Sequence, residues 1–319
     1  MLRAISGMVQ LLKDGQVSFC GSDICTCPPL YSTTKHNYST TKHNIFAFFF
    51  ACGNIIIVKT IKFIEKYGPY ALIAGGSDGL GYAFAEAIAR RGLNLVLIAR
   101  QKERLEAAAK QLEKDYKIDV ITITADAADN EGLKDSVMAL DVSIGLLVYN
   151  AAFAPIGLFE NMSEEQLAVA ASVNVTAPLL LTKLLSSAMI EQKRGGIVLM
   201  SSLAGAQGSP NLSVYAATKS FNAILAEGLW KELKPHGVDV LACCAGAIST
   251  PGYKQAEKTG AAPGTKTAGE VAEQTLNYLG RGPIVIPGAI NKIARFILTR
   301  LLSRKAAINL MSKNTGGLS

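Results

Sequence analysis

The sequence predicts an α/β fold in which a doubly wound parallel sheet of about seven strands forms the middle layer of an α/β/α sandwich. From Tyr70 onward, short β-rich runs alternate with longer helical patterns, as a parallel sheet with crossover helices requires. Runs such as Ile197–Met200 are wholly apolar, which is typical of strands covered on both faces. The 319 residues, 49% of them hydrophobic, suffice for one such domain with an atypical N-terminal extension.

Three regions follow from this pattern. Residues 1–66 are an N-terminal extension, residues 67–289 the α/β domain, and residues 290–319 a basic amphipathic helix and tail. The predicted strands are Ala71–Ala74, Asn94–Ile98, Asp119–Thr124, Gly145–Tyr149, Gly196–Met200, Asp239–Cys244 and Ile284–Ile286.

The extension differs from the rest of the chain. Its heptapeptide Tyr31–Asn37 is repeated as Tyr38–Asn44, which favours a disordered segment or a misplaced start codon. The apolar run Ile45–Val58 is shorter than the roughly 20 residues that span a bilayer. Together with Lys59–Lys66 it is a candidate interfacial helix that could touch a membrane.

The formal net charge of +7 raises the question of nucleic-acid binding. Basic residues gather around Lys59–Lys66 and Lys292–Lys313, mixed with apolar residues, and this pattern suits a membrane surface better than a duplex. We therefore expect no nucleic-acid partner. For the tail Ile290–Met311, peripheral membrane contact, packing on its own domain or a dimer partner, and a cover over a hydrophobic substrate mouth all stay open.

Six cysteines in a chain of this length do not indicate a disulfide framework, so we expect a cytoplasmic protein. Cys243 and Cys244 are predicted to be buried strand thiols. Cys25 and Cys27 with His36 or His43 fit no familiar zinc spacing, and no metal is expected.

A glycine-rich turn follows the first predicted strand and leads into the helical pattern Tyr82–Arg91. Gly75, Gly79 and Gly81 allow close backbone approach, with amide groups and the helix dipole directed at a pyrophosphate. A turn that serves packing alone is the alternative.

Arg100 follows the second strand, where an acidic residue would bind the ribose of NAD. A guanidinium there can pair with a 2′-phosphate, which favours NADP (NADPH), although a solvent-facing arginine is the alternative and Asp78 weakens the preference. Asp126 can accept a hydrogen bond from the adenine amino group or cap a helix.

Tyr215 and Lys219 form Tyr-x-x-x-Lys in a helical pattern that runs to about Leu233. At this spacing they share one face, and the ammonium favours the phenolate, so the tyrosine can exchange a proton. Ser202, at the carboxyl end of the fifth strand, can hydrogen-bond a substrate oxygen. Asn174 supplies a fourth polar group; capping by the serine and a tolerated helix asparagine are the alternatives.

With these motifs, residues 68–290 resemble the short-chain dehydrogenase/reductase family and its 3-oxoacyl-CoA reductase and 17β-hydroxysteroid dehydrogenase branch. The resemblance implies a Rossmann-like NADP-dependent oxidoreductase whose catalytic residues are Asn174, Ser202, Tyr215 and Lys219. By resemblance, Tyr215 transfers the proton, Ser202 positions the carbonyl, Lys219 binds the ribose and lowers the Tyr215 pKa, and Asn174 holds a water. It implies cofactor contacts from Gly75, Ser77, Gly79, Leu80, Gly81, Arg100, Asp126, Asn150, Tyr215, Lys219, Ile248 and Thr250.

Two positions depart from the family pattern: Ala152 replaces a glycine after the fourth strand, and Ala245 replaces the proline before Gly246. The segment from about Ser249 to Gly269 is predicted to be a mobile lid over the substrate. We expect interconversion of a lipid-like or acyl ketone and its alcohol by a homo-oligomer. The alternative is a non-catalytic NADP-binding sensor or a membrane-peripheral scaffold.

Overall fold

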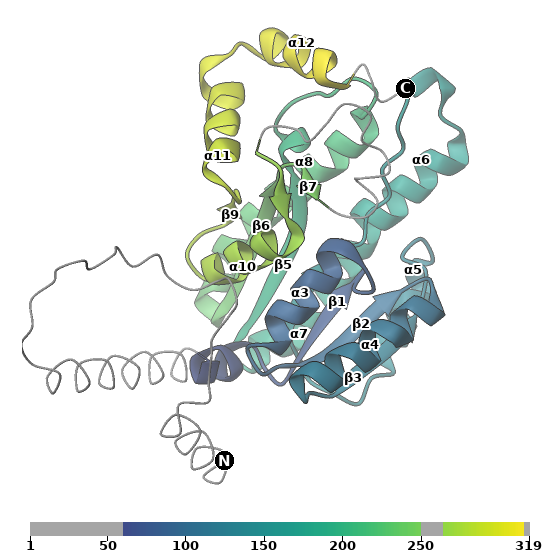
Figure 1. The fold of residues 1–319 in the computed structure, drawn as a ribbon, viewed down its shortest axis with the longest axis vertical. Coiled ribbons are helices and arrows are strands. Elements are labelled where there is room, and N and C mark those ends of the chain that lie inside the picture. Colours follow the sequence, from purple (N-terminus) through teal and green to yellow (C-terminus); the bar gives the residue numbers. More distant parts are fainter. Residues whose placement is uncertain (1–59, 250–263, 316–319) are drawn as a thin grey trace, which may run out of the picture. The chain divides into compact units, whose positions relative to one another are not determined.

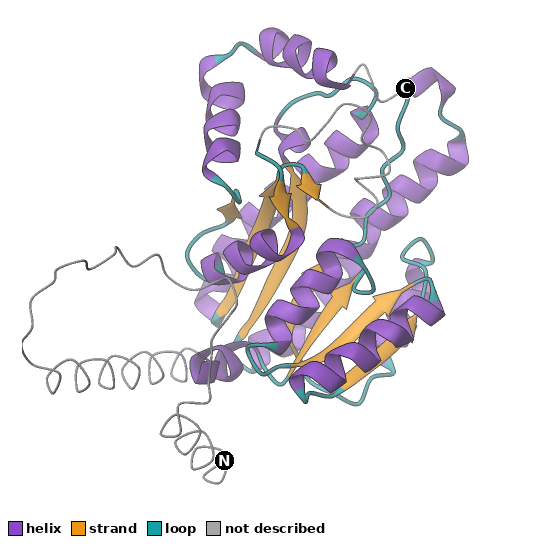
Figure 2. Cartoon of the chain, viewed as in Figure 1, coloured by secondary structure: helices purple, strands orange, loops and turns teal. Residues whose placement is uncertain are grey.

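The computed structural model of the chain describes residues 60–249 and 264–315, all within one unit, Gly53–Ser319. Its centre is a parallel sheet of seven strands in the order β3-β2-β1-β4-β5-β6-β9, with helices on both faces (Figures 1 and 2). The predicted α/β sandwich is therefore confirmed. The strands are β1 (Tyr70–Ala74), β2 (Asn94–Ala99), β3 (Val120–Thr124), β4 (Ile144–Tyr149), β5 (Gly195–Ser202), β6 (Val238–Ala245) and β9 (Ile284–Val285).

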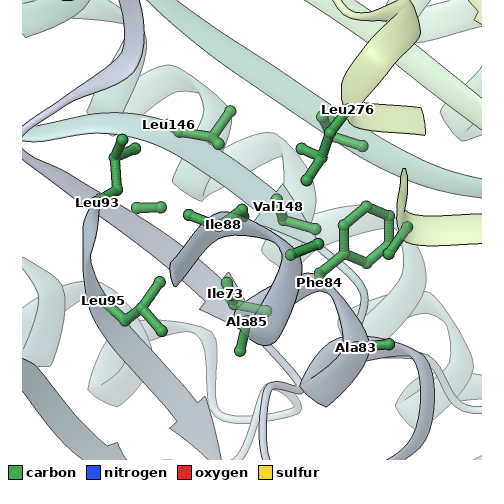
Figure 3. Close-up of a cluster of buried hydrophobic side chains, with 14 of the residues drawn as sticks. Ile73, Ala83, Phe84, Ala85, Ile88, Leu93, Leu95, Leu146, Val148 and Leu276 are labelled. Atoms are coloured by element: carbon green, nitrogen blue, oxygen red, sulfur yellow. The ribbon is translucent and has the colours of Figure 1, made fainter. Parts of the chain in front are cut away.

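Each strand sends alternate side chains to opposite faces of the sheet, and both faces are apolar. One core cluster joins residues such as Ile73, Leu97 and Val148 to helices α3 (Gly79–Ala89), α4 (Lys102–Tyr116) and α10 (Ala268–Tyr278). Figure 3 shows Phe84 and Ile88 of α3 packed against these strands.

The second core cluster covers the opposite face of the same sheet. There Leu72, Leu147 and Leu199 meet α5 (Asn130–Met138), α7 (Ala177–Glu191) and α8 (Ser213–Leu233). Cys243 and Cys244 are free and buried in β6, as predicted.

Helix α6 (Glu164–Ala171) continues into α7 through a turn of π-helix, Ser172–Thr176. The whole run Glu164–Glu191 is long and apolar enough to cross a bilayer. However, Leu181, Leu185 and Met189 pack in the second core cluster, which marks α7 as a core helix.

The N-terminal part of the described chain is also helical, over residues 60–67. Lys66 donates a hydrogen bond to the Gly237 carbonyl at 2.6 Å, and Tyr67 is buried in the first core cluster. The heptapeptide repeat, the cysteines before Cys52 and the apolar run 45–58 lie outside the described residues.

The C-terminal segment forms two helices, whereas the sequence predicted one. Helix α11 (Ala289–Phe296) passes into a π-helical turn, Ile297–Leu301, and the backbone is extended at Leu302 before α12 (Arg304–Thr315) begins. The chain thus changes direction, and Ala307 of α12 becomes fully buried. The remaining elements are the short strands β7 (Ile248–Ser249) and β8 (Lys266–Thr267) and the 3-10 helices Phe159–Asn161, Leu203–Ala206 and Lys234–His236.

Candidate active site

The site lies where the strand order reverses, at the carboxyl ends of the neighbouring strands β1 and β4. The segments that follow these two strands turn to opposite faces of the sheet, and open α/β sheets bind ligands in the crevice between such segments. Asn150, directly after β4, donates a hydrogen bond from Nδ2 to the Gly75 carbonyl at 3.1 Å. Asn150 therefore lies beside the glycine turn, while its contact with a cofactor stays a prediction.

Three glycines shape the turn between β1 and α3. Gly75 and Gly79 have positive φ angles of 78° and 55°, which favour glycine. A Cβ on Gly81 would lie 1.8 Å from the Gly75 carbonyl oxygen, so no larger residue fits there. The first turn of α3 therefore approaches the loop closely and can present its backbone amides to a phosphate, which fits a dinucleotide.

Asp78 caps α3, because its Oδ1 accepts a hydrogen bond from the Gly79 amide at 2.6 Å. The helix consequently begins at Gly79, earlier than the predicted Tyr82. The other carboxylate oxygen lies 3.8 Å from Nη1 of Arg104, in the first turns of α4. Sequence reasoning missed Arg104, because its approach to Asp78 joins two elements that only folding brings together.

Arg100 itself lies at the end of β2, with Nη1 4.0 Å from Oδ2 of Asp126. Both side chains are about half exposed or more, which leaves the guanidinium accessible. Asp126 also accepts a hydrogen bond from the Ala128 amide at 2.9 Å, so it caps a turn, while Asp129 caps α5. The contact of Asp126 with adenine stays a prediction.

Ser202 and Tyr215 meet at the carboxyl end of β5. The strand reaches Ser202, two residues beyond its predicted end, and pairs it with Ala245 of β6. Burial raises the pKa of the Tyr215 hydroxyl, and its side-chain hydrogen bond with Ser202 opposes that rise. The two hydroxyl groups can therefore bind the same substrate oxygen.

Lys219 lies one helical turn after Tyr215, with Nζ 5.6 Å from the centre of the tyrosine ring. Its ammonium donates to the Met200 carbonyl at 2.9 Å, and burial lowers its pKa to about 8. The expected lowering of the Tyr215 pKa is not observed, because desolvation of the phenol dominates and Lys219 is directed at Met200. A lysine with this pKa can nevertheless exchange protons near neutral pH.

Asn174 is fully buried in the π-helical turn between α6 and α7. Its Oδ1 accepts from the Phe153 amide at 2.9 Å, and its Nδ2 donates to the Phe153 carbonyl and to Oγ1 of Thr218. The side chain thus ties the loop after β4 to α8, beside Lys219. Sequence reasoning missed Thr218, and the water-holding role of Asn174 stays a prediction.

Contacts at the segment Leu203–Ala206 and at Ser201 before it fix the end of β5 against the backbone of Lys219 and Ser220 in α8. Oγ of Ser201 donates to the Lys219 carbonyl at 2.6 Å, and a Cβ on Gly205 would lie 2.7 Å from the Ser220 amide nitrogen. Further along the same loop, Gln207 is buried, and neither polar atom of its carboxamide has a hydrogen-bond partner among the described residues. Such a group can bind a polar atom of a substrate.

The other predicted cofactor residues are placed less specifically. Ser77 lies in the glycine turn, Leu80 and Ile248 pack partly against the first core cluster, and Thr250 lies outside the described residues, as does most of the predicted lid. Within residues 60–249 and 264–315, no group of three or more histidine, cysteine or acidic side chains could hold a metal ion.

Comparison with known proteins gives the same picture. Hydroxysteroid dehydrogenase-like protein 1 of Gallus gallus is 32% identical over 61% of this chain and 60% of its own length. A human relative, inactive hydroxysteroid dehydrogenase-like protein 1, is 33% identical over 56% and 55%. The chain thus spans less than two thirds of these two proteins. Very-long-chain 3-oxoacyl-CoA reductase of Phaeosphaeria nodorum is 34% identical over 71% of this chain and 68% of its own length.

Solved structures agree in fold. A 7β-hydroxysteroid dehydrogenase superimposes with a TM-score of 0.73 at 27% identity, covering 78% of this chain and 98% of that one. A short-chain dehydrogenase from Sphingobium yanoikuyae in complex with NADPH gives 0.66 at 31%, covering 72% and 91%. A 3-oxoacyl-[acyl-carrier protein] reductase from Brucella melitensis with bound NAD gives 0.61 at 25%, covering 69% and 90%. Because the short chain dehydrogenase family also matches residues 69–260, this chain belongs to the short-chain dehydrogenase/reductase family of oxidoreductases.

Proposed function

We propose that this protein is an NADP(H)-dependent oxidoreductase that interconverts a lipid-like or acyl ketone and its secondary alcohol, with Tyr215 as the acid/base. One observation carries the proposal: Ser202, Tyr215 and Lys219 converge at the carboxyl end of β5. That end of the sheet also carries the glycine turn.

The chemistry divides between the cofactor and the protein. When bound, the nicotinamide would supply or accept the hydride. In the reductive direction, the Tyr215 hydroxyl donates its proton to the substrate oxygen as negative charge develops there. The Ser202 hydroxyl donates a second hydrogen bond to that oxygen, which favours the transition state over the ground state. Lys219, with a pKa of about 8, can return a proton to the tyrosine.

Replacing Tyr215 with phenylalanine tests the proton transfer. Loss of the hydroxyl should lower kcat at least about 100-fold, which is the usual contribution of a positioned acid. NADPH affinity should fall by about tenfold at most, because one hydrogen bond of a neutral hydroxyl contributes about 0.5–1.5 kcal/mol. Oxidation of NADPH is followed across simple ketones, 3-oxoacyl thioesters and steroids, and NADPH binding is measured separately by titration. Undiminished turnover by Tyr215→Phe would rule out the assigned role.

Two guanidinium groups support a preference for NADP, that of Arg100 directly after β2 and that of Arg104 in the first turns of α4. Arg100 and Arg104 each lie within 4.0 Å of a carboxylate oxygen, of Asp126 and Asp78 respectively. All four groups are largely exposed, so either arginine can exchange its partner for a 2′-phosphate. The NADPH complex of the Sphingobium relative supports this preference.

Arg100→Ala should raise the KM for NADPH roughly 10- to 100-fold, because a hydrogen bond to a charged group contributes about 1.5–3 kcal/mol. The KM for NADH should hardly change. Lys102→Ala is the matched control, since this exposed lysine lies two residues away and pairs with Glu106. Equal effects on both cofactors would contradict a 2′-phosphate contact.

A lipid-like or acyl substrate is supported by the relatives, among which is a very-long-chain 3-oxoacyl-CoA reductase. A non-catalytic NADP-binding protein is the second candidate. One human relative is named inactive hydroxysteroid dehydrogenase-like protein 1, and the Lys219 ammonium donates its hydrogen bond to the Met200 carbonyl. Both observations favour this second candidate. NADPH binding without turnover of any ketone, 3-oxoacyl thioester or steroid would support the second candidate.

A further inference from the structure

Helix α11 and the π-helical turn after it expose most of their large apolar side chains and bury a polar one. Ile290, Ile293, Phe296 and Leu301 are each more than half exposed, and Ile297 is 38% exposed. We call these five residues the α11 face. None of them belongs to either core cluster of the sheet, whereas Asn291 of the same helix is only 4% exposed. A helix that only covers its own domain would turn its large apolar side chains inward, and among the apolar side chains described for residues 289–301 only Ala294 and Leu298 are half-buried.

Hydrogen bonds of Asn291 hold the start of this helix. Nδ2 of Asn291 donates to the Pro287 carbonyl at 2.9 Å and to the Gly264 carbonyl at 3.0 Å. A Cβ on Gly246 would lie 2.7 Å from its Oδ1, so the loop after β6 also packs closely on it. Asn291 thus anchors the helix while the side chains of the α11 face stay largely exposed among the described residues.

The charges around this face have one sign. Between Ala289 and Ser312 the chain carries Lys292, Arg295, Arg300, Arg304 and Lys305 and no acidic residue. Glu273 is the last acidic residue in the sequence. Cations are attracted to anionic lipid headgroups. Apolar side chains beside them can then insert into the boundary between the headgroups and the acyl chains. Two copies of the same surface would repel each other.

We propose that the α11 face docks on the surface of an anionic lipid membrane. Figure 1 shows α11 and α12 outside the helical layers that cover the sheet. Helix α12 lies against the loop between Ser202 and Tyr215: Nη1 of Arg304 donates to the Ala206 carbonyl at 3.1 Å, and a Cβ on Gly208 would lie 3.5 Å from Ile308. Docking therefore brings this loop close to the lipid, which suits the proposed lipid-like substrate, although the docking itself does not depend on that function.

Vesicle binding of the full chain tests the charge requirement. We expect binding to vesicles of phosphatidylserine and phosphatidylcholine to exceed binding to phosphatidylcholine alone, and to weaken with salt. Replacing Lys292 and Arg300 with glutamine should lower the affinity for the anionic vesicles about 30-fold, at about tenfold for each 1.4 kcal/mol and about 1 kcal/mol for each charge. The control replaces the exposed Lys110 and Lys114 of α4 with glutamine and should change little.

A local probe separates this face from other parts of the chain. The indole introduced by Phe296→Trp should be quenched by brominated lipids when vesicles are added, beyond the quenching of native Trp230 in the unchanged protein. Met138→Trp, at a residue of α5 with 59% exposure, should not be quenched beyond that level. Failure of the full chain to bind anionic vesicles would overturn the proposal, as would vesicle binding in which the Phe296→Trp variant shows no added quenching. A concentration-dependent dimer that Ile293→Ser dissociates, without lipid, would assign the face to a second copy instead.

Discussion

Lys219 is a titratable residue of the site whose ammonium is almost fully removed from water. Its side chain is 3% exposed, and the Met200 carbonyl accepts a single hydrogen bond from its ammonium. Desolvation therefore lowers its pKa from 10.5 to about 8. Such a displacement is a statement about stability as well as about proton transfer, because the folded and unfolded chains bind protons differently.

The sign of the effect follows from the two pKa values. Between about pH 8 and pH 10.5 the unfolded chain holds the Lys219 proton and the folded chain has lost it, so this group makes the free energy of unfolding rise with pH. The rise should amount to about 3 kcal/mol and be missing in Lys219→Met. Urea unfolding of both proteins across this range measures the difference, with the exposed Lys110→Met as control.

The difference between proteins is the quantity to compare, because other groups act in the opposite direction. Burial raises the pKa of the Cys243 thiol from 9.0 to about 12, which makes the folded state lose stability as pH rises above 9. If Lys219→Met and the unchanged protein show the same pH dependence, Lys219 is not the depressed lysine described above.

At the scale of elements, the connection from β5 to α8 decides whether the catalytic residues meet. The segment Leu203–Ala206 packs on α8 through Gly205, whose missing Cβ leaves room for the backbone of Lys219 and Ser220. Ser201 adds a hydrogen bond to the Lys219 carbonyl. Strand β5 and helix α8 are therefore held together by contacts at Ser201 and Gly205, on either side of Ser202.

Gly205→Ala should push this segment away from α8 and lower kcat at least about tenfold, because small misplacements of catalytic groups are costly. Gly228→Ala is a matched control in α8, where a Cβ would meet nothing within 4 Å. That control should keep its activity and gain about 0.5–1 kcal/mol in stability. Unchanged kcat in Gly205→Ala would show that the contact does not position Ser202.

At the scale of the whole molecule, contacts distant in sequence attach the helix over residues 60–67 to the sheet. The Tyr67 hydroxyl donates to Oδ2 of Asp239, 172 residues away, at 2.8 Å, and Lys66 lies 3.6 Å from the same oxygen. Phe63 packs edge-on against Tyr67. These contacts join the helix before β1 to β6.

Tyr67→Phe should lower the free energy of unfolding by about 1–3 kcal/mol, because it removes a buried donor from a carboxylate. Tyr70→Phe, at the start of β1, is the control for the loss of a hydroxyl as such. Chemical denaturation followed by circular dichroism gives both values. A Tyr67→Phe midpoint equal to that of the control would mean that Lys66 alone satisfies Asp239.

Patterns in the sequence alone predict the alternation of strands and helices, the glycine turn and the candidate residues Ser202, Tyr215 and Lys219. These predictions rest on local patterns, because periodicity and motif spacing depend only on residues close together in the sequence. Contacts between residues distant in the sequence could not be predicted from such patterns, and tertiary structure set them. It directed Lys219 to Met200, tied Asn174 to Phe153 and Thr218, brought Arg104 to Asp78 and divided the C-terminal segment into two helices. Each of these depends on residues brought together by folding, and burial, which sets the pKa of Lys219, exists only in the folded molecule.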